Sequence, residues 1–203
     1  MQNLSQDEMA GERQRAGVLF GRGMAAVITV SFGFIWMGWG FSALPTFRPY
    51  EWAVLYAGTV VLLVFAIRGV RRGRKQLKAL GADRRAYWAK RGRKFGIITA
   101  LEVVGCGIVV ALAVGFHRMD LIAVGISAVV GAHFLPLAGL FDFPVYYVTG
   151  VTIILCDLVS LSRFHGDAIT AMSGIVTGAI LWLTGIYALA LSRRLTPGAP
   201  VPA

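Results

Sequence analysis

Residues 68–94 read RGVRRGRKQLKALGADRRAYWAKRGRK, a basic run with twelve Lys or Arg side chains and a single acid, Asp83. Long apolar stretches stand on both sides of it. The whole chain is 57% apolar and 15% charged over 203 residues, with a mean hydropathy of +0.69, which is more apolar than a water-soluble domain of this length. We therefore expect an integral membrane protein whose basic run stays on one side of the bilayer.

The apolar stretches number six, and each reaches or approaches the roughly 20 helical residues needed to cross a hydrocarbon core. Apolar and polar residues do not alternate along them, which excludes a barrel and favours helices. The second stretch is short, but Arg68 can extend it by turning its charge back to the headgroups. We expect an all-α polytopic membrane protein with six transmembrane helices in three hairpins: Met24–Leu44, Trp52–Ile67, Phe95–Phe116, Leu121–Phe141, Phe143–Ser162 and Ala168–Leu191.

The chain is expected to form one transmembrane helical-bundle domain, residues 1–203, with a polar N-terminal tail at 1–16, a basic cytoplasmic loop at 68–94 and a Pro-rich C-terminal tail at 196–203. The first apolar stretch also resembles a signal peptide in outline, with a basic region from Arg13 to Arg22 and a cleavage zone at 41–44. Its apolar part is longer than such peptides carry and five more spans follow. An uncleaved first helix is therefore the expectation.

Orientation follows from the charges in alternate connections, because cytoplasmic loops retain Lys and Arg. With the N-terminus inside, seventeen Lys or Arg fall on one side and only Arg48, Arg118 and Arg163 on the other. Both termini and the basic run are therefore expected in the cytoplasm.

The basic run is expected to attract anionic lipid headgroups, at about 1 kcal/mol per basic residue near the surface. The alternative is that it only sets topology. Nucleic-acid binding is not expected, because the run is too short to build a recognition module. Gly81 and Ala82 should break it, with Asp83 capping a helix that continues into the third span. The residues expected at the headgroups are Arg71, Arg72, Arg74, Lys75, Arg91, Arg93 and Lys94.

Three ionisable residues, Glu102, His133 and Asp157, lie within the apolar spans, where charge is costly and is normally directed to the protein interior. Counting residues along each span puts Glu102 and His133 at a similar depth and Asp157 nearer the outer face. Pro136 frees a backbone carbonyl and kinks the helix beside His133. The three residues are therefore candidates for a proton or cation path if their helices adjoin.

Structural roles are the competing interpretation of the same residues. Arg22 can pair with Glu102 as a plain ion pair, His133 can donate a hydrogen bond to a neighbouring helix, and Asp157 can bond to hydroxyls of the sixth span. Small and hydroxyl residues predict close packing of the last two spans and include the GxxxG spacing Gly174–Gly178. The positions are Thr149, Thr152, Cys156 and Ser160 on the fifth span and Thr170, Gly174, Thr177, Gly178 and Thr184 on the sixth.

No motif for a phosphate loop, a nucleophile or a paired carboxylate occurs, and no cofactor or metal is expected. Cys106 and Cys156 fall in mid-span, where cysteine acts as a small packing residue. External pairs of His and Asp, at 117 and 120 and at 165 and 167, are the one alternative for a metal.

The segment Gly131–Phe141, GAHFLPLAGLF, with Pro144 and Tyr146 close behind it, resembles a stretch of small bacterial membrane proteins of unassigned function. The resemblance implies a bacterial inner membrane and no activity.

Three functions remain open. The first is passage of a small solute or ion, with or without proton coupling, along the buried ionisable residues. The second is a non-transporting scaffold that binds lipids or a partner through the basic run. The third is an intramembrane enzyme, for which the sequence offers no nucleophile. Glycine-rich helix faces also permit a homo-oligomer.

Overall fold

The computed structural model describes residues 6–46, 48–81 and 84–193. Over those ranges the chain is helical, with one short 3-10 turn and no strand, and each of the six α-helices is long and apolar enough to cross a membrane. The expected all-α fold with six spanning helices is confirmed. The elements are α1 Gln6–Ser42, α2 Pro49–Ala79, α3 Arg84–Gly115, η1 Met119–Leu121, α4 Ile122–Phe141, α5 Val145–Arg163 and α6 Asp167–Arg193.

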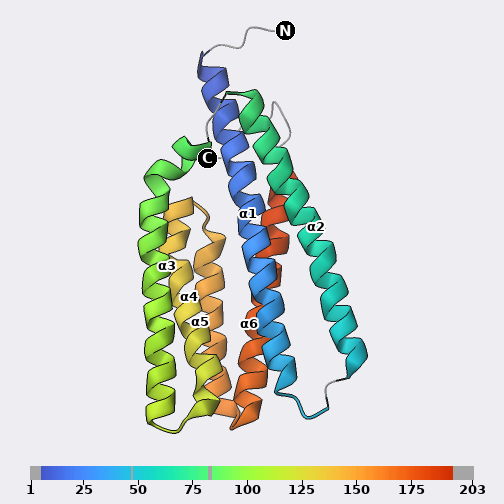
Figure 1. Ribbon diagram of the computed structural model, residues 1–203, viewed down its shortest axis with the longest axis vertical. Coiled ribbons are helices and arrows are strands. Elements are labelled where there is room, and N and C mark those ends of the chain that lie inside the picture. The colour runs from blue at the N-terminus through green and yellow to red at the C-terminus, as the bar shows by residue number, and fades with distance from the viewer. Residues whose placement is uncertain (1–5, 47, 82–83, 194–203) are drawn as a thin grey trace.

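The helices differ in length. α1 and α2 have 37 and 31 residues, whereas α4 and α5 have 20 and 19. At 1.5 Å per residue α1 and α2 run for about 55 and 46 Å, well beyond a hydrocarbon core of about 30 Å. Figure 1 shows the start of α1 and the end of α2 standing together beyond the turn between α4 and α5. We call residues 6–24 of α1 and 68–80 of α2 the α1–α2 projection.

The α1–α2 projection has a small apolar core of its own, formed by Ala16, Phe20 and Leu77 with Val70 packed against it. This corrects two expectations. Residues 6–16 are not a tail, because α1 begins at Gln6 and its apolar side chains find a partner in α2. The basic run is not a loop, because its first part completes α2 and its last part begins α3. Residues 1–5 and the predicted tail at 196–203 lie outside the described chain.

The break in the basic run falls where the sequence indicates. α2 closes with backbone bonds from Leu80 N to Gln76 O and from Gly81 N to Lys78 O, at 3.0 and 3.2 Å. Gly81 has a φ of +62°, a left-handed conformation that glycine adopts without strain. The predicted cap, Asp83, lies outside the described residues.

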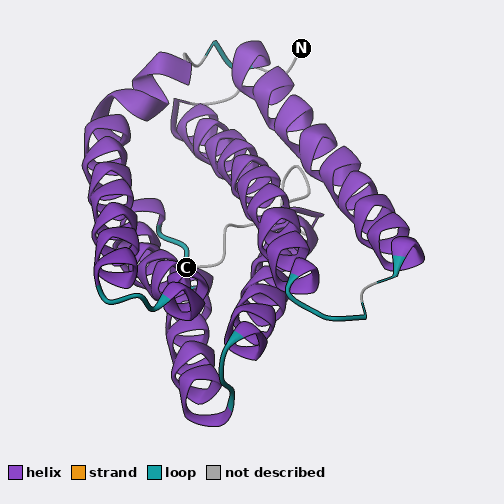
Figure 2. Ribbon diagram, turned by 60° about the horizontal axis from the view of Figure 1, so that its bottom comes forward, coloured by secondary structure: helices purple, strands orange, loops and turns teal. Residues whose placement is uncertain are grey.

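The bundle is arranged as two groups. α1 packs on α2 and α6, while α3 packs on α4 and α4 on α5, and α6 joins the groups through α4 and α5. Figures 1 and 2 show α3 at the periphery, beside α4. Only 6% of the most apolar part of α3 is buried, against 44% for α6. Most of α3 is therefore left for lipid.

The most extensive contact joins the first and last helices and is made by glycine. A Cβ at Gly174 would lie 2.6 Å from Gly40 Cα, and one at Gly178 would lie 2.7 Å from Gly33 O. The GxxxG pair was expected to face the fifth span, but it faces α1, because Gly33 and Gly40 supply the matching flat surface. The indole of Trp182 fits beside this crossing and donates to Val30 O at 3.2 Å.

Arginines bond to the carbonyl-rich ends of α2, α4 and α6, which all lie at the same end of the bundle. A helix C-terminus carries partial negative charge and free carbonyls, so cations are favourable there. Each of the three ends receives an arginine from another helix. The bonds are Arg13 Nε to Leu80 O at 3.2 Å, Arg91 Nε to Leu140 O at 3.2 Å and Arg22 Nη1 to Leu191 O at 3.4 Å.

Candidate functional site

Glu102 on α3 meets His133 on α4, with Oε2 and Nδ1 3.3 Å apart. The side chains are 20% and 10% exposed, so the pair is mostly but not fully covered at the α3–α4 contact. His133 Nδ1 is buried without a hydrogen-bond partner, and so is Thr99 Oγ1 on α3. The contact between Glu102 and His133 is therefore within ion-pair distance but lacks the geometry of a hydrogen bond. The pair can hold a charge or a proton between two helices.

The predicted ion pair between Arg22 and Glu102 is not formed. Arg22 bonds to Leu191 O and lies 5.9 Å from the ring centre of Phe143, whereas Glu102 faces His133. The physical reason is that α1 packs on α2 and α6, and α3 packs on α4.

Pro136 lies inside α4, one turn after His133, and α4 continues through it to Phe141. Because proline has no N–H, the carbonyl of Ala132 lacks its usual backbone donor. The kink expected there stays a prediction.

Asp157 on α5 forms a second polar site, where it is 3% exposed. Its Oδ1 accepts a hydrogen bond from Ser173 of α6 at 2.8 Å, while its Oδ2 has no partner. Ser127 of α4 lies beside the same carboxyl and shares a hydrogen bond with Thr177 of α6 at 2.6 Å. We call Asp157, Ser127, Ser173 and Thr177 the carboxyl–hydroxyl site. It ties three helices together.

The two polar sites do not converge. Ser127 and His133 are six residues apart on α4, which separates them by about 9 Å along the helix and about 120° around it. α3 and α5 both pack on α4. In the described residues Glu102 contacts His133 and Asp157 bonds to Ser173, and a single path through all three ionisable residues stays a prediction.

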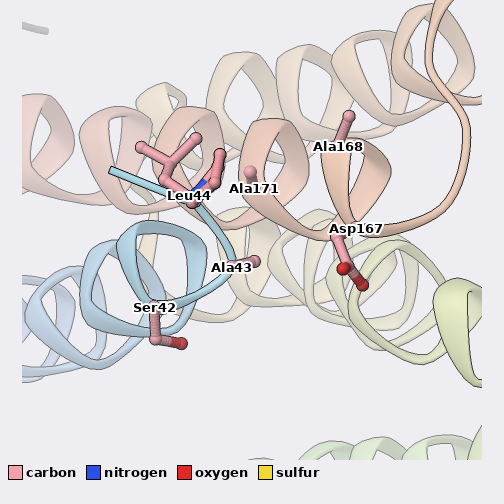
Figure 3. A pocket seen from close by; sticks show the side chains of 7 residues that line it. Ser42, Ala43, Leu44, Asp167, Ala168 and Ala171 are labelled. Carbon is pink, nitrogen blue, oxygen red and sulfur yellow. The ribbon is translucent and has the colours of Figure 1, made fainter. Parts of the chain in front are cut away.

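The pocket in Figure 3 lies away from both sites, at the end of α1 and the start of α6. Its volume is about 540 Å³, and its lining includes Leu44, Asp167 and Ala171 but none of the three buried ionisable residues. Within the described chain, no three His, Cys, Asp or Glu side chains come close enough together to hold a metal.

A basic face covers the outer side of α2. Six cations along it are exposed, and none forms an ion pair with a described acid. We call them the α2 basic stripe: Arg68, Arg71, Arg72, Arg74, Lys75 and Lys78.

The rest of the predicted headgroup set divides in two. Arg93 and Lys94 on α3 are exposed. Arg91 instead turns to the protein, where it bonds to Leu140 O and pairs with Asp142 at 3.3 Å. The end of α4 offers it a free carbonyl and a carboxylate.

The predicted bond from a hydroxyl of the sixth span to Asp157 is confirmed, with Ser173 as the donor, whereas sequence reasoning overlooked Ser127. Ser127 is the one hydroxyl residue in α4, which was the available signal, since a lone hydroxyl in an apolar span usually has a partner on another helix. The predicted hydroxyl stripe does join α5 to α6 at another point, where Thr149 and Thr184 share a hydrogen bond of 2.7 Å.

The fold and sites define a class, the helical membrane proteins with six spans. No family model matches the chain, and comparisons with curated proteins and with solved structures find no match either. The resemblance of Gly131–Phe141 to bacterial membrane proteins stays a prediction.

Proposed function

We propose that the protein is a membrane-embedded scaffold whose α2 basic stripe binds an acidic segment of a partner protein. The observation that carries the proposal is six exposed cations without an ion-pair partner among the described acids, on a helix of 31 residues, which is longer than a hydrocarbon core requires. The proposal takes the basic end as cytoplasmic and the bilayer as a bacterial inner membrane, on the charge distribution and the segment resemblance described above.

The stripe occupies one side of α2. At 100° per residue its six cations span about 160° of the helix. The opposite side packs on α1 through Ala66, Gly73 and Leu77, which are all buried. The charges are therefore held on a helix that is anchored along its other face.

The six cations of the stripe fall into two triplets at different distances from the hydrocarbon core. Taking Ile67 as the edge of the apolar span, a rise of 1.5 Å per residue puts Arg68, Arg71 and Arg72 within about 8 Å of the hydrocarbon. That distance is about the thickness of the headgroup layer. We call these three the near triplet. The far triplet, Arg74, Lys75 and Lys78, reaches about 10 to 17 Å, beyond the headgroups of its own membrane.

This difference in height supports a protein partner. Lipid headgroups of the same bilayer can neutralise the near triplet. They lie below the far triplet, whose charges are then available to carboxylates in solution.

The test compares two triple substitutions in nanodiscs of zwitterionic lipid, with fluorescent poly-glutamate as the probe. One variant changes the far triplet to Gln, and the matched control changes the near triplet to Gln. The far-triplet variant should lose about tenfold or more in affinity, since each exposed ion pair contributes up to about 1 kcal/mol. The near-triplet control should lose less, and binding should weaken with salt.

Equal losses in the two variants, or no binding by the unsubstituted protein, would contradict the proposal. A larger loss in the near triplet that appears only in anionic nanodiscs would assign the stripe to lipid.

Passage of protons is the second candidate, favoured by the contact between Glu102 and His133 inside the membrane. Proteoliposomes with an internal pH dye measure it directly. Glu102→Gln should abolish an uptake that Glu12→Gln, outside the apolar spans, leaves intact. An uptake that survives Glu102→Gln excludes this route.

A further inference from the structure

We infer that the carboxyl–hydroxyl site binds a small monovalent cation of the Na⁺ type. The site lies on α4, α5 and α6, whereas the α2 basic stripe lies on α2, past the apolar part of that helix. The inference therefore does not depend on the proposed function. Its ligand atoms would be the free carboxylate oxygen of Asp157 and the hydroxyls of Ser127, Ser173 and Thr177.

The charge of Asp157 is the first reason. The residue is 3% exposed within a spanning helix, and burying a carboxylate without a counter-charge is among the costliest arrangements in a membrane. Along α4, α5 and α6 the other charged residues are Arg163 and Asp167, at the helix ends away from the basic end, and Arg193, the last residue of α6, which lies at the opposite end of that helix from Asp167. Neither Arg163 nor Asp167 pairs with Asp157, and the imidazole of His133 faces Glu102.

The oxygen geometry is the second reason. Oδ2 of Asp157 is fully buried without a hydrogen-bond partner, although Oδ1 is bonded to Ser173. The three hydroxyl residues are each no more than 1% exposed and come from α4 and α6. Four side chains with oxygen atoms therefore meet in the buried interior. Oδ2 of Asp157 is the carboxylate oxygen that has no hydrogen-bond partner there.

The composition of the site selects the ion. Carboxylate and hydroxyl oxygens are ligands for hard cations. One carboxylate neutralises one positive charge, so a divalent ion would leave a net charge in the membrane. The oxygens already bond to one another, at 2.6 Å from Ser127 to Thr177 and 2.8 Å from Ser173 to Asp157, so an ion must move them apart, and Na⁺ requires a smaller displacement than K⁺.

The experiment measures binding of radiolabelled Na⁺ to the purified full-length protein, together with its melting temperature in NaCl, KCl and choline chloride at equal ionic strength. Na⁺ should bind and raise the melting temperature in proportion to the logarithm of its concentration, as mass action requires. Choline should have no such effect, and K⁺ a smaller one.

Variants assign the effect to the site. Asp157→Asn should abolish Na⁺ binding. Thr177→Val should weaken it by about tenfold or more, because loss of even an indirect ligand contact costs about 10- to 100-fold in metal affinity. Thr184→Val is the matched control, since Thr184 lies two turns along α6 and makes the same kind of buried hydroxyl bond, to Thr149. It should lower the melting temperature and leave Na⁺ affinity unchanged.

Three results would overturn the inference: equal stability of the unsubstituted protein in Na⁺ and choline, Na⁺ binding that persists in Asp157→Asn, or equal loss of affinity in Thr177→Val and Thr184→Val. An infrared band of a protonated carboxyl that disappears in Asp157→Asn and does not respond to Na⁺ would overturn it as well, and would identify a proton as the occupant.

Discussion

Substituting Gly178 by Ala tests whether the crossing of α1 and α6 is held by backbone contact. A Cβ at this position would lie 2.5 Å from the side-chain Cγ of Met37, 2.7 Å from Gly33 O and 2.8 Å from Met37 N. The last two atoms are backbone, which cannot turn aside as a side chain can. Since an ordinary van der Waals contact begins at 3.4 Å, the two helices must part by about 0.7 Å.

The cost follows from that separation. A gap of 0.5 to 1 Å forfeits a quarter to a half of a contact worth about 0.1 to 0.2 kcal/mol, and about forty such contacts give a loss of roughly 1.5 to 3 kcal/mol. The better helix propensity of Ala returns at most about 1 kcal/mol. We therefore expect Gly178→Ala to lower the free energy of unfolding by about 0.5 to 2 kcal/mol.

The assay is unfolding in mixed micelles of increasing SDS fraction, followed by circular dichroism. The matched control is Gly107→Ala on α3, where an added Cβ meets nothing within 4 Å. The control should unfold at the same SDS fraction as the unsubstituted protein or a higher one. If Gly178→Ala proved as stable as Gly107→Ala, the close approach of α1 and α6 would be refuted.

Two more substitutions probe bonds between helices. Arg91→Gln removes a cation from the end of α4 and its bond to Leu140 O; we expect a loss of about 0.3 to 1 kcal/mol in the same unfolding assay, whereas Arg93→Gln, which is exposed, should cost nothing measurable. Trp182→Phe removes the indole donor to Val30 O, which is a second donor to a carbonyl inside α1, so it should cost about 0.5 to 1.5 kcal/mol, the net value of one hydrogen bond. A neutral Trp182→Phe would show that this bond does not help to hold α6 against α1.

The number and type of the helices could be predicted because crossing lipid imposes length and apolarity on each segment by itself. The residues at which the helices begin and end could not be predicted in the same way. The first turns of α1, from Gln6, read as polar, and they are helical because Ala16 and Phe20 pack on Leu77, more than fifty residues away in the chain. A window of local sequence contains no sign of that partner.

The sequence also could not predict which helices and side chains contact one another within the membrane. The Gly174–Gly178 spacing indicates a flat helix face but does not say which helix covers it, and the neighbour along the chain was the wrong choice. Arg22 was assigned to Glu102 and Arg91 to lipid headgroups, whereas both bond to carbonyls near a helix C-terminus. A helix C-terminus attracts cations through its backbone carbonyls, which have no sequence signature. Asp157 was recognised as buried, whereas Ser127 went unnoticed because a single serine in an apolar span is easily missed.

The contact between α1 and α6 sets an order of events during synthesis. α1 ends at Ser42, and α6 begins only at Asp167, so at 5 to 20 residues per second the first helix waits about 6 to 25 s for its main neighbour. Until then its glycine face is covered by lipid or by the insertion machinery. A ribosome that stalls before the last helix therefore leaves an open, recognisable intermediate, and proofreading by membrane proteases would act on that species.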